Sequence, residues 1–279
     1  MNEPLLLLPF TGTNGGETTA DISLYANPTF ITPGLATTST TNEKFAGVLS
    51  LDMPQFDPLT VTAPCYVPFA SGSALDIFRL TGGWTIEGWF NISSDSGVQL
   101  FLVTMNGTTA VGFGGYSFVI SAVLNGDNTI TLSCNDYATF GSGATRTATY
   151  PASTPGTWHH FAIVNNGTLT TLYADGIAGG TYVSWNAANY GGPFVNANSP
   201  NVVIGSFSGY SGVTQAGYIS QIRISGYPVY TSNFTPPSGP FTVFAPTGQG
   251  DITDPFAWQD STGTLPPIGF ANDSDGSNF

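Results

Sequence analysis

The sequence predicts an all-β protein in which antiparallel strands form a two-sheet jelly-roll sandwich. Three observations support this fold class. The 279 residues include 35 Gly, 20 Pro and 13% aromatic residues, a composition that favours strands and turns. Several segments alternate apolar and polar residues, and Asn-Gly or Asp-Gly pairs separate them as in hairpins. Sustained helical periodicity with capping residues is not found in the sequence.

The first element is an expected strand over Leu5–Leu8. No basic residue precedes these leucines and Pro9 ends the apolar run, so they do not read as a signal peptide. Residues 21–42 are rich in Thr and Pro and alternate little, and we expect a long surface connection there.

Turn pairs divide the middle of the chain into an antiparallel meander. They predict strands over residues 98–105, 116–124, 161–164 and 169–174, which are followed by Asn106-Gly107, Asn125-Gly126, Asn166-Gly167 and Asp175-Gly176 respectively. This rhythm is typical of a two-sheet sandwich.

The segment 217–241 predicts the last strand. Strict alternation places Tyr218, Ser220, Ile222 and Ile224 on one face, and Ile219, Gln221, Arg223 and Ser225 on the other. Gly226 and Pro228 should then end the strand.

These residues resemble the closing segment of the laminin-G-like, concanavalin-A-like domains found in bacteriophage virion proteins. Four other segments resemble the landmarks of that family in the same order: Leu5–Asp21, Asn42–Gly47, Trp84–Phe90, and the pair 156–163 with 172–176. The resemblance implies a lectin-type jelly roll over residues 1–243. Residues 244–279 would form an extended, acidic tail dotted with aromatic residues.

The charge balance narrows the range of partners. Four Lys and Arg residues against 17 Asp and Glu residues give a formal net charge of −13. Such a surface repels nucleic-acid backbones and anionic membranes, and no apolar stretch approaches the length of a membrane span. Neutral glycans or other proteins are the partners that this charge favours.

The two cysteines, Cys65 and Cys134, lie far apart in the sequence and outside any CxxC motif. A disulfide between them is an alternative, but we expect two buried free thiols in a protein that folds in a reducing cytoplasm.

Candidate catalytic residues are few. Glycosidases use a pair of carboxyl groups, whereas Glu87 stands alone in its predicted strand, and we expect it to be a hydrogen-bonded strand carboxylate. His159 and His160 are neighbours on a strand and point to opposite faces, so they cannot bind one metal ion together. We expect one of them to pack inward with a hydrogen bond and the other to be solvated. The sequence predicts no catalytic residue and no metal site.

Calcium is the one candidate cofactor, because some laminin-G-like relatives bind it. Asn272–Gly276 is the best cluster of oxygen ligands and Asn125–Asn128 the second, but neither is followed by the glutamate of an EF-hand loop. We expect both to be polar turns.

Two sets of aromatic residues are candidate contact sites. Trp185, Tyr190 and Asn196 in one loop and Tyr210 in another could hold a glycan, although packing beneath the loops or against a neighbouring subunit is equally consistent with the sequence. In the tail, we expect docking on the sandwich or on a neighbour through these aromatic residues: Phe256, Trp258, Phe270 and Phe279.

The resemblance therefore implies a non-enzymatic protein on the virion surface, made in the host cytoplasm, as capsid decoration or as a fibre-like appendage. Its partners would be other virion proteins and further copies of itself, with a trimer as the expected oligomer. Two alternatives remain: an adhesin that binds host-surface glycans, and a glycan-degrading enzyme of the same fold.

Overall fold

The computed structural model describes residues 3–31, 36–53, 65–68, 75, 77, 80, 82–92, 99–106, 117–136, 146–151, 154–183, 201–205 and 217–242. All of these residues lie in one compact unit, Asn2–Phe244. The elements in this part of the chain are fifteen strands. The described residues contain no helix that is long and apolar enough to cross a membrane.

The strands have the following bounds: β1 (Pro4–Leu8), β2 (Phe30–Ile31), β3 (Thr37–Ser39), β4 (Ser50–Met53), β5 (Cys65–Pro68), β6 (Trp84–Ile92), β7 (Gln99–Asn106), β8 (Ser117–Leu124), β9 (Ile130–Asp136), β10 (Arg146–Tyr150), β11 (Trp158–Asn165), β12 (Leu169–Ala174), β13 (Ile177–Val183), β14 (Asn201–Ile204) and β15 (Gly217–Ser225).

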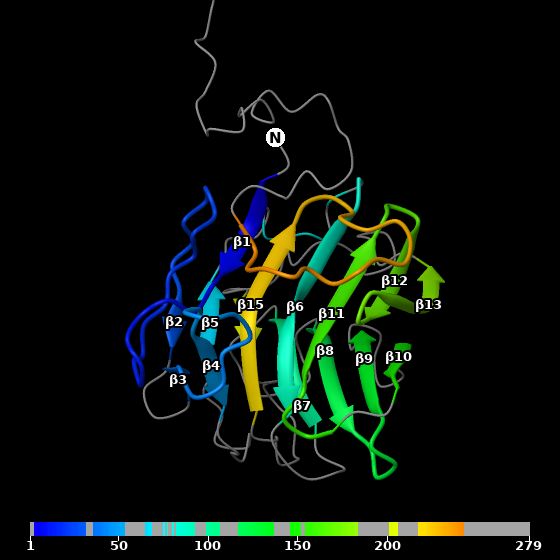
Figure 1. Cartoon of the computed structure of the whole chain (residues 1–279). Helices are drawn as coiled ribbons and strands as arrows, with labels where there is room; N and C mark the ends of the chain where they lie inside the picture. The colour runs from blue at the N-terminus through cyan, green and yellow to red at the C-terminus, as the bar shows by residue number, and fades with distance from the viewer. Residues whose placement is uncertain are drawn as a thin grey trace, which may run out of the picture. The chain divides into compact units, whose positions relative to one another are not determined.

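Two antiparallel sheets face each other (Figure 1). The eight-stranded sheet has the order β13-β12-β11-β6-β15-β4-β3, and β1 pairs with β15 beyond the end of β4. The seven-stranded sheet has the order β10-β9-β8-β7-β14-β5-β2. The all-β, two-sheet sandwich predicted from the sequence is therefore confirmed.

The predicted strands agree with the observed ones at β1, β6, β7, β8, β11, β12 and β15. The expectation of a long surface connection over residues 21–42 was partly wrong, because β2 and β3 lie within it. These two edge strands have two and three residues, which is too short for an alternating pattern to show in the sequence.

One hydrophobic core fills the space between the sheets. Edge-to-face contacts join the two layers, with ring centroids 5.8 Å apart for Trp84 and Phe118 and 5.6 Å apart for Phe90 and Tyr150. The hydroxyl of Tyr150 also donates a hydrogen bond of 2.9 Å to the carbonyl of His160 in the other sheet. Burying such large rings supplies much of the free energy that holds a sandwich closed.

A β-bulge in β15 corrects the predicted alternation of this strand. Pairing with β6 skips Gln221, which has a φ of 50°. The extra residue restarts the alternation, so Ile219 joins Ile222 and Ile224 in the core although strict alternation places it on the opposite face. The facing Gly88 leaves room for the bulge, because a Cβ there would lie 2.7 Å from the carbonyl oxygen of Gln221.

The outer face of the eight-stranded sheet is covered by the chain that follows β15. This C-terminal strap, residues 226–242, runs from the end of β15 over β6 and β11 and then returns across the same strands (Figure 1, yellow to orange). Tyr230 and Phe234 of the strap pack on Ala162, Val164 and Tyr173. The strand ends near Gly226, as predicted, but the chain stays on the sheet after leaving its ladder.

Candidate functional site

The polar centre of the molecule lies under the strap, on the outer face of the eight-stranded sheet. Glu87 occupies the middle of β6, between Ala162 of β11 and Arg223 of β15 in the strand register. The preceding residue, Ile86, points into the core. Because side chains alternate along a strand, the Glu87 side chain points to the outer face. Its exposed fraction is nevertheless 0%.

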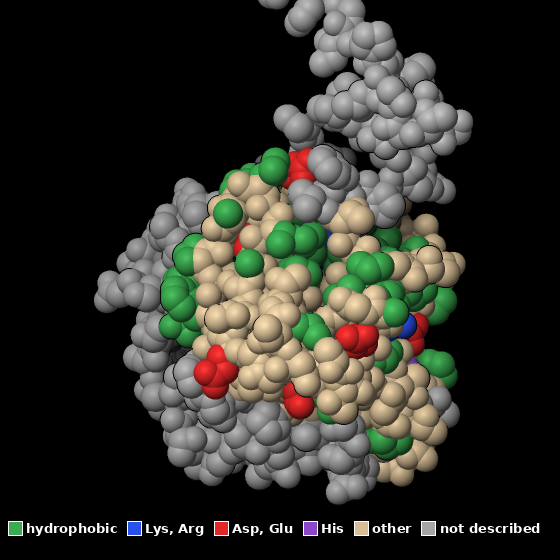
Figure 2. Space-filling model, turned by 60° about the vertical axis from the view of Figure 1, so that its left-hand side comes forward, with side chains coloured by type: hydrophobic (Ala, Val, Ile, Leu, Met, Phe, Trp, Pro, Cys, Tyr) green, Lys and Arg blue, Asp and Glu red, His purple; other side chains and the backbone are tan. Residues whose placement is uncertain are grey.

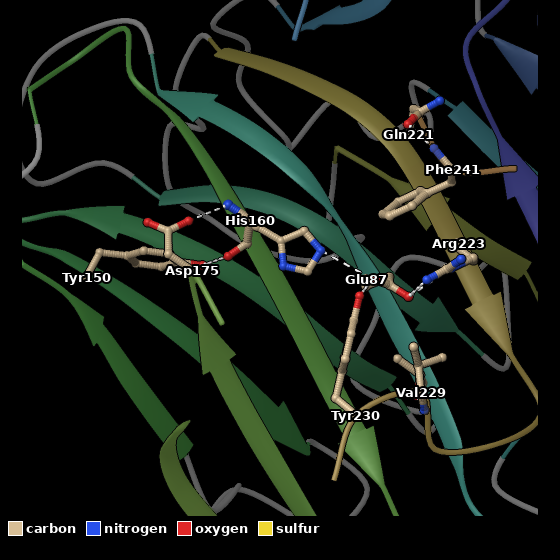
Figure 3. Close-up of polar contacts among 10 residues, drawn as sticks. Glu87, Tyr150, His160, Asp175, Gln221, Arg223, Val229, Tyr230 and Phe241 are labelled. Carbon is tan, nitrogen blue, oxygen red and sulfur yellow. Dashed lines mark hydrogen bonds and ion pairs between the residues drawn. The ribbon is translucent and has the colours of Figure 1, made fainter. Parts of the chain in front are cut away.

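Both carboxylate oxygens of Glu87 are fully occupied (Figure 3). Oε1 accepts hydrogen bonds from Nε and Nη2 of Arg223 at 2.8 and 2.6 Å. Oε2 accepts one from the Tyr230 hydroxyl at 2.9 Å and contacts Nε2 of His160 at 3.2 Å. An ionised carboxylate can only accept, so Nε2 is the histidine nitrogen that carries the hydrogen.

The ion pair controls the protonation of its members. Burial alone would raise the pKa of Glu87, but the Arg223 guanidinium and His160 together hold it below its usual value. Burial likewise opposes the charge of Arg223, and the Glu87 carboxylate raises the pKa of that guanidinium. Burial and then the neighbouring carboxylate raise the pKa of Tyr230. Glu87 and Arg223 therefore both stay charged near neutral pH.

The strap is fixed over this pair by hydrogen bonds at its beginning, middle and end. The Thr85 hydroxyl donates to the carbonyl of Tyr227 and accepts from the amide of Val229, both at 2.9 Å. At the β12–β13 turn, the amide of Phe234 donates to the carbonyl of Gly176 at 3.0 Å. The amide of Phe241 donates to Oε1 of Gln221 at 2.8 Å. The bulged residue of β15 thus holds the end of the strap.

The expectation for the two histidines was half wrong. His159 and His160 do point to opposite faces, but both are buried, with exposed fractions of 6% and 0%. His159 points to the core and packs against the ring of Tyr150, and its Nδ1 is 2.7 Å from Oδ2 of Asp175. His160 is not solvated because the strap covers it, with the ring of Phe234 5.7 Å away.

Asp175 also fixes the hairpin between β12 and β13. Its Oδ1 accepts a hydrogen bond of 2.7 Å from the amide of His160, and its own amide donates to the His160 carbonyl at 3.0 Å. The residue has a φ of 47°, and the following Gly176 a φ of 79°, as a two-residue hairpin turn requires. This confirms the turn predicted from the Asp-Gly pair.

The geometry offers neither acid–base chemistry nor metal binding at Glu87. A general acid must reach its substrate, whereas Glu87 is completely buried and has no free lone pair. Its prediction as a hydrogen-bonded strand carboxylate is confirmed. Within the described part of the chain, no group of three or more His, Cys, Asp or Glu side chains could hold a metal ion.

The second calcium candidate, Asn125–Asn128, forms the β8–β9 turn. Oδ1 of Asp127 accepts hydrogen bonds from the amide and hydroxyl of Thr129 at 3.0 and 2.7 Å, and these bonds lower the pKa of Asp127. Nδ2 of Asn125 donates to two threonine hydroxyls across the hairpin. The side chains of Asn125 and Asp127 therefore stabilise the polar turn that was expected here. The first candidate, Asn272–Gly276, lies outside the described residues.

The predicted contact residues also lie outside the described residues. These are the glycan candidates Trp185, Tyr190, Asn196 and Tyr210, and the tail residues Phe256, Trp258, Phe270 and Phe279. Their roles stay predictions. Both cysteines are described, and they are buried free thiols as expected.

Sequence reasoning missed the pairing of Glu87 with Arg223, although one signal was present. The chain has only four Lys and Arg residues, and Arg223 stands in an apolar strand, as Glu87 does. Two isolated opposite charges in buried strands seldom stay unpaired. That rule could have predicted the ion pair of Glu87 and Arg223 before the strand register was known.

A family model described as "Concanavalin A-like lectin/glucanases superfamily", Laminin_G_3, matches residues 66–232. This range covers more than half of the chain and runs from the second residue of β5 past the end of β15. No match was found among the curated proteins.

Solved structures with a similar fold include three proteins whose reported ligands are gangliosides, a modified sialic acid and an oligosaccharide. A structure of botulinum neurotoxin type C, reported with the dependence of its cell entry on two ganglioside molecules, is 10% identical with a TM-score of 0.53. The Trypanosoma rangeli sialidase bound to 2,3-difluorosialic acid is 11% identical with a TM-score of 0.52. Domain 4 of an extracellular arabinanase from Geobacillus stearothermophilus, bound to arabinotriose, is 12% identical with a TM-score of 0.50.

The extent of the similarity differs among these structures. Each match covers 82% of this chain, but only 49% of the neurotoxin chain and 31% of the sialidase chain. It covers 95% of the arabinanase domain. At these identities, the similarity concerns the lectin-like sandwich fold alone.

Proposed function

We propose, from the premise that this chain belongs to the concanavalin A-like lectin/glucanases superfamily, that it is a non-enzymatic glycan-binding protein on the surface of a bacteriophage particle. The observation that carries the non-enzymatic part is the saturation of Glu87. Its four hydrogen-bonding contacts and complete burial leave this strand carboxylate unable to act on a substrate.

Most glycosidases hydrolyse the glycosidic bond with two reachable carboxyl groups, separated by about 5–10 Å. The strand neighbours of Glu87 in the register are Ala162 and Arg223, so neither supplies a second carboxylate. The strap also lies over this face of the sheet (Figure 1), and its Tyr230 hydroxyl donates a hydrogen bond to Oε2 of the fully buried Glu87. A binding role for this chain accords with that arrangement better than catalysis does.

The glycan-binding part is supported by fold and charge. Among the proteins of similar fold, the cell entry of the neurotoxin depends on two ganglioside molecules, and the arabinanase domain was solved with bound arabinotriose. The net charge of −13 disfavours acidic sugars, because like charges repel across the interface. We therefore expect neutral oligosaccharides to be the ligands, held by the predicted residues Trp185, Tyr190, Asn196 and Tyr210.

The particle location is supported by the resemblance of five ordered segments to phage virion domains. The scarcity of Lys and Arg, four residues in 279, also leaves few sites for trypsin-like proteases outside the cell. Capsid decoration and a fibre-like appendage are the two placements that the resemblance allows, and glycan binding favours an appendage that reaches the host.

The binding test is an array of neutral oligosaccharides that includes arabinotriose, probed with the full chain beside sialylated glycans as charged controls. We expect binding to neutral glycans that Trp185→Ala or Tyr190→Ala weakens by about two- to tenfold, because each stacked ring contributes about 0.5–1.5 kcal/mol. Ile177→Ala, which removes an exposed side chain of β13, should leave it unchanged. Binding to none of these glycans would contradict the proposal.

Two further measurements separate the alternatives. Release of reducing ends from the bound oligosaccharides would instead favour the enzyme of the same fold. Gold-labelled antibodies against the chain, applied to phage particles, should mark the tail if the protein is an adhesin. Label over the capsid together with no glycan binding would favour decoration.

A further inference from the structure

In the segment between β1 and β2, polar side chains are buried and apolar side chains are exposed, which is the reverse of an ordinary surface loop. In this edge segment, residues 21–30, the polar side chains Asp21 and Ser23 are buried, whereas Asn27 and Thr29 are partly buried. The large apolar side chains of the same segment point to solvent. The segment connects a strand of the eight-stranded sheet with the edge strand of the other sheet.

The inward side chains fix the backbone of the edge segment. Oδ1 of Asp21 accepts hydrogen bonds of 2.9 Å from the amides of Leu7 and Ser23. Its Oδ2 accepts from the Ser23 hydroxyl at 2.8 Å and from the amide and Nδ2 of Asn27 at 2.8 and 2.7 Å. Thr29 donates to the carbonyl of Thr19 at 2.6 Å. The outward direction of the apolar residues is therefore set by a bonded scaffold.

The outward side chains form the largest accumulation of exposed apolar residues in the described part of the chain. Six large hydrophobic side chains are exposed there, and four belong to this segment: Ile22 (40%), Leu24 (70%), Tyr25 (53%) and Phe30 (46%). Phe30 stacks on Tyr66 of β5, with ring centroids 5.1 Å apart, which extends the apolar surface along the sheet edge. Single exposed apolar residues are ordinary, but clustered ones on a fixed backbone indicate an interaction surface.

The charge distribution argues against a basic partner and is compatible with a second copy of this chain. From Thr18 to Asn42 the only charged side chain is Asp21, and it is buried and fully hydrogen-bonded. Figure 2, in which the N-terminal strands come forward, shows hydrophobic and neutral polar side chains with only a few separate carboxylates. A surface made for a basic partner would carry carboxylates, which this chain has in excess. Two copies with a charge of −13 each repel each other least where neither presents charge.

We propose that the edge segment is the surface on which copies of this chain associate. Ile22, Leu24 and Tyr25 of one copy pack on the same residues of another, and the stacked Phe30 and Tyr66 form the adjoining part of the contact. This association is independent of glycan binding, which the sequence places on other loops.

The test is sedimentation equilibrium of the full chain at concentrations up to about 100 µM. We expect an oligomer whose association strengthens when NaCl rises from about 0.05 to about 0.5 M, because salt screens the repulsion between acidic copies. Leu24→Asp should weaken the association by about tenfold or more, since it replaces a buried apolar contact with two facing charges. Ile177→Asp, at a leucine-sized residue outside the segment that is also more than half exposed (58%), is the matched control and should leave the mass unchanged.

Leu24→Asp is expected to fold normally, because its side chain is 70% exposed and makes no core contact; circular dichroism and the melting temperature check this. Leu24→Gln should weaken association less than Leu24→Asp. A dimer or a trimer that depends on Leu24 supports the proposal. A monomer at both salt concentrations, or an oligomer that Leu24→Asp leaves intact, overturns it.

Discussion

Glu87 and Arg223 form an ion pair with an Nη2–Oε1 distance of 2.6 Å, in which the two side chains are 0% and 3% exposed. They are 136 residues apart in the sequence and meet because β6 and β15 are neighbours in the sheet. Removing one member of such a pair leaves an uncompensated charge in a medium of low dielectric constant.

Arg223→Met should therefore lower the free energy of unfolding by about 3–5 kcal/mol, measured by urea denaturation. The double variant Glu87→Gln/Arg223→Met should be more stable than the sum of the two single losses predicts, because it removes both charges. Tyr230→Phe, which removes one neutral donor from the same carboxylate, should cost only about 1.5–3 kcal/mol. Strict additivity of the two charge-removing substitutions would refute a direct pair.

The pair also predicts how stability depends on pH. The pKa of Glu87 is lower in the folded protein than in the unfolded chain, so its contribution is complete above the unfolded value of about 4.3. That contribution is lost as pH falls through the lower, folded pKa. The free energy of unfolding of the wild-type protein should thus decrease below pH of about 4.3, and that of Glu87→Gln should decrease less. Equal acid slopes for both proteins would show that Glu87 is not the group responsible.

Gly176 determines how closely the strap can approach the β12–β13 turn. A Cβ at this residue would overlap the carbonyl oxygen of Phe234, and the φ of 79° disfavours any other residue. Gly176→Ala should lower the free energy of unfolding by about 1–2 kcal/mol from backbone strain alone, with a further loss from displacing the strap. Hydrogen exchange should show reduced protection of the Phe234 amide.

Gly126→Ala is the matched control for this substitution. Gly126 also lies in a hairpin turn, but a Cβ there would meet no atom within 4 Å. Its stability and its exchange pattern should stay close to those of the wild-type protein. Normal protection of the Phe234 amide in Gly176→Ala would mean that the strap does not depend on this contact.

The two thiols should be unreactive in the native protein. Cys65 and Cys134 are fully buried, and burial raises the pKa of Cys65 to about 12. They lie on β5 and β9, which are separated by three strands, or about 19 Å at ordinary strand spacing. A disulfide is thus excluded without rearrangement. Mass spectrometry should show labelling by a thiol reagent only after denaturation, with both residues labelled at similar rates.

The sequence predicted local elements well because their signals are local. The Asn-Gly and Asp-Gly turns and the alternating strands between them need only a few neighbouring residues to be recognised. The resemblance to laminin-G-like domains extended this to the sandwich as a whole. Edge strands β2 and β3, with two and three residues, are held by pairing with β5 and β4 rather than by a pattern of their own.

The candidate site was harder to predict because it depends on distant pairs. Tyr230 and Glu87 are 143 residues apart, and no periodicity connects them. The bulge at Gln221 gave no signal either, since a residue other than glycine adopts the positive φ. Consequently the burial of His160 and the inward position of Ile219 could be known only once the strap and the register were seen.

The position of β15 in the chain has a consequence for synthesis. This strand lies between β6 on one side and β1 and β4 on the other, yet it is made after the other fourteen strands that the structure describes. A ribosome-bound chain that stops before Gly217 leaves the backbone N–H and C=O groups at the edges of β6, β1 and β4 without their partner strand. The eight-stranded sheet can therefore close only after β15 has been made, and chaperones that protect exposed strand edges would act on this protein until that moment.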